Sequence, residues 1–203
     1  GRYSFQGCVD VTWADELHQF PMALSYPGSL ECETLDSLNT VAQELVSGLV
    51  LEDGFVRFEW LQCSATERFH FLGMESGLLA NALPVDLVRF AGGVDIKENY
   101  EGLLNGEKVV PYSMPSGASA LTWLRSCSGI VELIEGIDDA RAMDRVEVVE
   151  LRLAPGERIG HLLDTKSRDA LGYVLTSGAT LEEALAVAAQ AVETIQIHTK
   201  TIF

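Results

Sequence analysis

The sequence predicts an α+β fold in which antiparallel sheets pack against helices. Three observations favour this class: a pair of neighbouring β-type segments, a run of short alternating segments in the second half, and a final helical stripe that begins with a capping box. With 203 residues and 47% hydrophobic composition, the chain can form one full domain or a domain plus a small lobe. We place the division between 1–106 and 107–203.

The N-terminal third gives weaker signals. Residues 1–10 have the pattern of a strand interior, because Tyr3, Phe5 and Val9 share one phase. No initiating Met precedes them, and we therefore interpret the chain as a fragment of a longer protein. Residues 20–29 are rich in Pro and Ser and predict a loop, whereas residues 35–49 place apolar side chains at helical spacing and predict a helix.

The most informative segments are two candidate strands, 55–60 and 68–77, joined by a polar turn. They place Glu59 and Glu75 on neighbouring strands in an apolar setting, where a buried carboxylate needs a proton, a cation or a metal. The alternative is a solvated face, since Arg57 lies two residues before Glu59 and can pair with it.

The remaining elements follow from local signals. Pro84 is placed to open a short helix that ends at Gly92, and Asp95 is placed to cap a helix over 96–104. Thr180 and Glu183 form the predicted capping box of the last helix, which should lie across a sheet containing 172–176. The other predicted strands are 109–112, 118–124, 129–134 and 145–153.

Composition excludes several classes of protein. A formal net charge of −16 argues against a nucleic-acid binder, and no stretch approaches the roughly 20 apolar residues of a membrane span. The four cysteines form no C-x-x-C pair, and the chain shows no signal-type segment, so we expect a cytoplasmic protein with free thiols. The common dinucleotide, P-loop, zincin and hydrolase motifs are absent, and Cys63 with His70 supplies only two zinc ligands.

The order of elements resembles the distal part of an ATP-grasp ligase. The resemblance rests on 54–60, 69–72 and 84–96. In that family a Glu on the first strand and a Glu-x-Asn-x-Arg motif on the second hold magnesium and the ATP phosphates. Downstream, the sequence is similar to the C-terminal lobe of carboxylate–amine ligases of the L-amino-acid ligase kind, and also to that of biotin carboxylase, over 129–136, 146–158, 167–174 and 178–184.

The resemblance implies a metal site with an altered motif. Glu59 matches the first metal-binding Glu, but the second motif falls on residues 73–77, which place Gly73, Glu75 and Gly77 where Glu, Asn and Arg are expected. A shift of one or two residues puts Glu75 in the second Glu slot, so Glu59 and Glu75 are the metal candidates. Asn81 is a distant substitute for the missing Asn, and no catalytic or nucleotide-contacting residue is assigned.

The first functional hypothesis is the C-terminal part of an ATP-dependent carboxylate–amine ligase that forms an amide or peptide bond through an acyl-phosphate. Mg²⁺ and ATP are expected only together with the upstream half. The expected partners are small carboxylate and amine substrates, the upstream half of the same protein or a partner chain, and a second copy in a possible homodimer. The alternatives are a catalytically inactive ATP-grasp-like module that binds a metabolite or partner protein, and a self-standing α+β binding protein.

Overall fold

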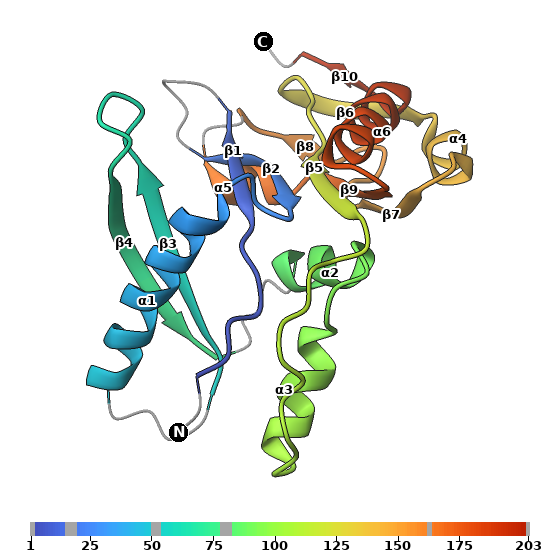
Figure 1. Cartoon of the computed structure of the whole chain (residues 1–203). Helices are drawn as coiled ribbons and strands as arrows, with labels where there is room; N and C mark the ends of the chain where they lie inside the picture. Colours follow the sequence, from blue (N-terminus) through green and yellow to red (C-terminus); the bar gives the residue numbers. More distant parts are fainter. Residues whose placement is uncertain (1–2, 15–19, 50–53, 78–82, 162–163, 202–203) are drawn as a thin grey trace.

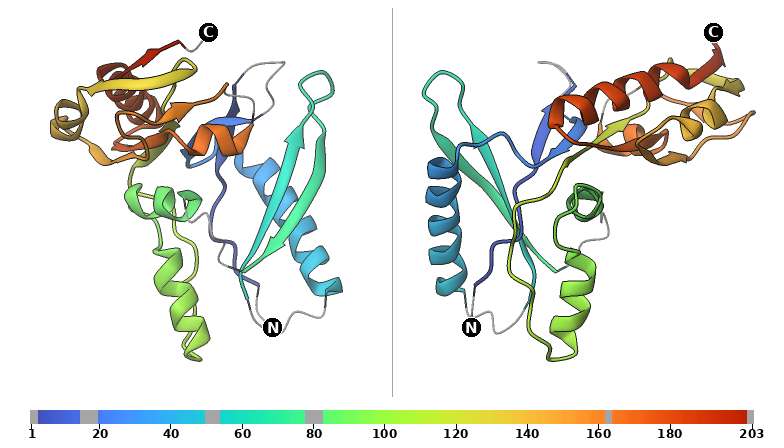
Figure 2. Two further views of the ribbon diagram at one scale, coloured as in Figure 1. Left: turned by 180° about the vertical axis from the view of Figure 1, so that it is seen from behind. Right: turned by 45° about the vertical axis from the view of Figure 1, so that its right-hand side comes forward.

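A computed structural model describes residues 3–14, 20–49, 54–77, 83–161 and 164–201. Its elements confirm the α+β class with antiparallel sheets. Helix α1 (Cys32–Gly48) lies beside the hairpin of β3 (Val56–Gln62) and β4 (Phe69–Ser76), as Figure 1 shows. Helix α3 (Ile96–Leu104) points away from the C-terminal strands in the views of Figure 2.

A five-stranded antiparallel sheet carries the main core. Its order is β1 (Asp10–Trp13), β2 (Pro21–Tyr26), β5 (Ala118–Trp123), β9 (Gly172–Gly178) and β7 (Val146–Leu151). Tyr26, Leu121 and Val174 are fully buried in it. Because β2 pairs with β5, strands from both sides of the 106/107 boundary share this sheet, and the division into two domains stays a prediction.

The last helix lies across the sheet as predicted, but its predicted capping box is only half formed. Helix α6 (Leu181–Thr194) packs on β5 and β9, and Ala184, Ala188 and Ala191 form its buried stripe, where small side chains let the helix lie close to the sheet. The Thr180 hydroxyl accepts from the Glu183 amide, while the Glu183 carboxylate accepts from the Ala179 amide instead of closing the box on Thr180.

A second, three-stranded sheet completes the C-terminal part. It has the order β10 (Gln196–Lys200), β6 (Gly129–Glu135) and β8 (Arg158–Ile159). Helix α4 (Ile137–Ala142) contacts α6 and β7. Short helix α5 (Thr165–Asp169), which the sequence analysis did not predict, begins with a capping box between Asp164 and Ser167.

The middle helices confirm their predicted starts. Helix α2 (Leu83–Phe90) has Pro84 in its first turn, and the Asp95 side chain accepts from the amides of Lys97 and Glu98 at the start of α3. None of the described helices is long and apolar enough to cross a lipid bilayer.

Three expected segments differ. Residues 3–9 lie outside any strand. Their polar side chains contact helices instead: the Tyr3 hydroxyl donates to Asn39, and the Asn99 amide donates to Gln6. The predicted loop at 20–29 contains buried strand β2, in which Met22, Leu24 and Tyr26 enter the core and Pro21 occupies the tolerated first position.

The third difference is residues 109–112, which form no strand. The Asn99 side chain bonds both the amide and the carbonyl of Val110, so one side-chain amide satisfies the backbone groups that a neighbouring strand would pair. This buried Asn also binds Gln6, and thereby ties the N-terminal segment to the arm that follows α3.

Candidate functional site

The register of the β3–β4 hairpin decides which side chains share a face. Arg57 pairs with Glu75, and Glu59 pairs with Gly73. Paired positions point to the same side and alternate along the strand, so these four residues, which we call the Arg57 face, lie together.

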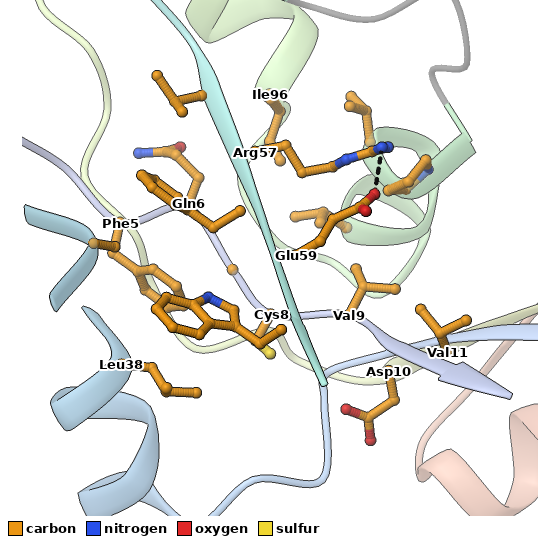
Figure 3. A pocket seen from close by; sticks show the side chains of 18 of the residues that line it. Phe5, Gln6, Cys8, Val9, Asp10, Val11, Leu38, Arg57, Glu59 and Ile96 are labelled. Atoms are coloured by element: carbon orange, nitrogen blue, oxygen red, sulfur yellow. Dashed lines mark hydrogen bonds and ion pairs between the residues drawn. The ribbon is translucent and has the colours of Figure 1, made fainter. Parts of the chain in front are cut away.

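The opposite face is aromatic. The register shifts between Glu59 and Trp60, so that Trp60 pairs with Phe71. The ring centroids of Trp60 and Phe71 lie 5.4 Å apart, and those of Phe58 and Phe71 lie 6.3 Å apart. Figure 3 shows the side chains of Arg57 and Glu59 on one side of β3 and those of Phe5 and Leu38 on the other.

One guanidinium joins the two candidate carboxylates. Nη2 of Arg57 lies 2.7 Å from Oε1 of Glu59 and 2.7 Å from Oε2 of Glu75. The two oxygens can therefore be no farther apart than twice that distance. The prediction that Glu59 and Glu75 lie on neighbouring strands is confirmed, and in the structure both carboxylates contact Nη2 of Arg57.

The apolar, buried setting expected for these carboxylates is wrong. The side chains of Glu59 and Glu75 are 51% and 49% exposed, and Arg57 is 34% exposed. Solvent and Arg57 together balance their charge, as the solvated alternative required. The Arg57 Nε is itself buried and has no hydrogen-bond partner among the described residues.

The donor set fits a two-carboxylate magnesium site. Mg²⁺ is usually held by one or two carboxylates, with water and substrate phosphate completing its shell. A side chain built at Gly73, directly across from Glu59, would meet no atom within 4 Å, so the face is open there. In the part of the chain that the structure describes, no three His, Cys, Asp or Glu side chains gather as a larger metal site.

The altered motif at residues 73–77 also has an unusual backbone conformation at its last residue. Gly77, at the position where the family resemblance expects Arg, has a φ of +93°, a region that side-chain-bearing residues rarely adopt, so an Arg in this backbone conformation would be strained. Asn81 lies outside the described residues. The described hairpin therefore supplies two carboxylates and Arg57, but no side chain at positions 73 and 77.

A broad cleft of about 1970 Å³ runs beside the hairpin. The N-terminal segment, α1, β3, α2 and α3 line it, and Arg57 and Glu59 are among its lining residues. Along its wall, burial and the neighbouring Asp10 raise the pKa of Cys8 to about 11, so this thiol stays protonated near neutral pH.

Arg168 is a buried residue that the sequence analysis did not single out. Its side chain is 4% exposed, donates to the Pro21 carbonyl and to Asp169, and lies 3.6 Å from the centroid of the Trp123 ring. It joins α5 to β2 from within the core, which no local sequence signal indicates.

The comparisons identify what the chain is similar to. The L-amino acid ligase C-terminal domain 2 family matches residues 122–200. Among solved structures, the chain resembles phosphoribosylglycinamide synthetase from Anaerococcus prevotii with 14% identity and a TM-score of 0.78, over 95% of this chain and 49% of that one.

Two further structures have the same fold. L-amino acid ligase from Bacillus licheniformis matches 89% of this chain and 46% of its own length, with 17% identity and a TM-score of 0.74. Biotin carboxylase from Campylobacter jejuni, solved with an ATP analogue, matches 94% and 42%, with 17% identity and a TM-score of 0.64. The chain thus spans about half the length of these three structures, and no curated protein sequence matches it significantly.

Proposed function

We propose that this chain is the C-terminal part of an ATP-dependent carboxylate–amine ligase. Residues 122–200 match the L-amino acid ligase C-terminal domain 2 family, and the chain has the fold of about half of an ATP-grasp enzyme. The observation that carries the proposal is the convergence of Glu59 and Glu75 on one cation, on the hairpin of such a fold.

The proposed reaction has two steps. A carboxylate oxygen of the first substrate attacks the γ-phosphorus of ATP, and ADP leaves. The amine of the second substrate then attacks the acyl carbon of the resulting acyl-phosphate and loses a proton, while phosphate leaves with one oxygen of the original carboxylate. The product is an amide or peptide bond.

Glu59 and Glu75 are the proposed magnesium ligands. Bound there, Mg²⁺ would neutralise phosphate charge during transfer. Their carboxylates already share one cation and lie on one face, which supports this assignment. An upstream half would supply the rest of the site for the nucleotide and both substrates.

We further propose that the protein is cytoplasmic, that its substrates are small molecules, and that it assembles as a homodimer.

The second candidate is a catalytically inactive ATP-grasp-like module that binds a metabolite or a partner protein. Gly77 favours the inactive module. Glycine has no side chain that could stabilise charge on a phosphate, and an Arg in this backbone conformation would be strained. Losing one preorganised stabilising donor costs an active site about 10²- to 10³-fold in rate. Arg57, on the same face as the carboxylates, is the cation that the described hairpin retains.

The test is amine-dependent phosphate release by the full-length polypeptide that contains this chain. With ATP, Mg²⁺ and mixtures of amino acids, the ligase proposal predicts release that needs both substrates, and loss of that release in Glu59→Gln. Glu132→Gln, an exposed position on β6, removes the same charge and should keep the wild-type rate. A folded wild-type protein that releases no amine-dependent phosphate would leave the inactive module as the function.

A further inference from the structure

We propose that Arg57 is a built-in competitor of the divalent cation: its guanidinium occupies the position between Glu59 and Glu75 in the metal-free protein and must leave when a metal binds. This inference rests on the metal role proposed for the two carboxylates. It assigns to Arg57 a positioning role, since it holds both ligands on one point and sets the affinity of the site.

The geometry makes the two cations mutually exclusive. A single donor nitrogen, Nη2 of Arg57, is 2.7 Å from one oxygen of each carboxylate and so lies between them. Mg²⁺ bound to the same two oxygens at about 2.0–2.1 Å would also have to lie between them. The guanidinium and the metal would therefore occupy overlapping positions and cannot be present together.

The strand register keeps Arg57 at this point. Glu75 is the direct cross-strand partner of Arg57, and Glu59 lies two residues along the same strand, so both carboxylates are held beside it by the backbone ladder. Gly73, across from Glu59, adds no side chain that could take over either contact. Without Arg57, two negative charges would face each other without a counter-ion.

Exposure makes the exchange feasible. The three side chains of the two ion pairs are 34–51% exposed, and ion pairs at such sites are individually weak. A fully buried pair would lock the carboxylates against a metal, whereas this one can open. The same exposure gives water access to the shell of an entering ion.

The experiment measures Mn²⁺ binding by the chain, without ATP or substrates, from the loss of the free-ion electron paramagnetic resonance signal. Arg57→Met removes the competitor and should tighten binding about two- to thirty-fold, the range expected when two exposed ion pairs no longer oppose the metal. Arg141→Met changes the net charge equally on α4, where Arg141 pairs with exposed Asp138, and should leave the affinity unchanged.

Two further variants decide the outcome. Glu59→Gln added to Arg57→Met should abolish the gain, and Arg57→Gln should reproduce it if the Met variant does not fold. Unchanged or weaker Mn²⁺ binding after neutralising Arg57, equal tightening in Arg141→Met, or a gain that survives Glu59→Gln would overturn the inference. Because no turnover is measured, a ligase assay that fails while the affinity gain is present would refute the proposed function and leave this inference standing.

Discussion

The first prediction concerns Arg168, the buried side chain that joins helix α5 to strand β2. In Arg168→Met the side chain keeps a similar length and apolar stem but loses its charge. The wild-type guanidinium donates to the Pro21 carbonyl on β2 and to Asp169 on its own helix, and it stacks on Trp123 of β5. Burial lowers the pKa of Arg168, as expected for a charge withdrawn from water, although the nearby Asp169 opposes the shift.

The expected loss of stability follows from these contacts. A hydrogen bond from a charged donor contributes about 1.5–3 kcal/mol, and a desolvated cation–π contact contributes about 2 kcal/mol. Asp169 is 26% exposed and can regain water, and Met removes the cost of burying a charge while filling the same space. Because these terms partly offset, we expect a net loss of about 3 kcal/mol in the free energy of unfolding.

Urea denaturation followed by tryptophan fluorescence measures this loss. For a chain of this size, about 3 kcal/mol also lowers Tm by roughly 6–12 °C. Lys166→Met is the matched control, because Lys166 is exposed on the same helix, and its effect should stay within about 0.5 kcal/mol. An Arg168→Met variant as stable as the Lys166→Met control would refute the view that this buried cation holds α5 against β2.

Three other predictions follow from the structure. Gly73→Glu should tighten Mn²⁺ binding several-fold, because the new carboxylate lies across from Glu59 in open space; unchanged binding would contradict the register. Iodoacetamide labelling read by mass spectrometry should modify Cys63 well before Cys8, since hydrogen bonds from Thr66 and Ala65 lower the pKa of Cys63 whereas burial and Asp10 raise that of Cys8; the reverse order would contradict this. Partial burial raises the pKa of Glu150, but bonds from Tyr173 and Arg152 outweigh it, so the net pKa lies below 4.5 and the ionised form favours folding. The difference in the free energy of unfolding between wild type and Tyr173→Phe should therefore be largest above pH 4.5 and should shrink in acid. A difference that thermal melts show to be independent of pH would contradict this role of Glu150.

Local signals predicted the elements whose ends are fixed by neighbouring residues. Asp95 caps α3, Pro84 lies in the first turn of α2, and the apolar stripe of α6 faces the sheet, because each depends on contacts within a few residues. Strand β2 was missed although Met22, Leu24 and Tyr26 alternate, because Pro and Ser in the same stretch resemble a loop. Its pairing with β1 and β5, which no local signal indicates, makes it a strand.

The candidate site was predictable in membership but not in geometry. Two glutamates on adjacent strands could be read from spacing, yet their joint contact with Arg57 depends on the register, in which Arg57 faces Glu75 and Glu59 faces Gly73. A slip of one residue in this pairing would place Glu59 and Glu75 on opposite faces of the hairpin. Arg168 shows the same limit, because its partners Pro21 and Trp123 lie far away in the sequence.

The most direct measurement of the proposed function follows one oxygen atom. The full-length polypeptide is incubated with ATP, Mg²⁺, an amine and a substrate in which both carboxylate oxygens are ¹⁸O, and the released phosphate is analysed by mass spectrometry. The account predicts one ¹⁸O in the phosphate for each amide formed, because the carboxylate oxygen attacks the γ-phosphorus. Unlabelled phosphate, or phosphate released at a rate that does not depend on the amine, would contradict the account.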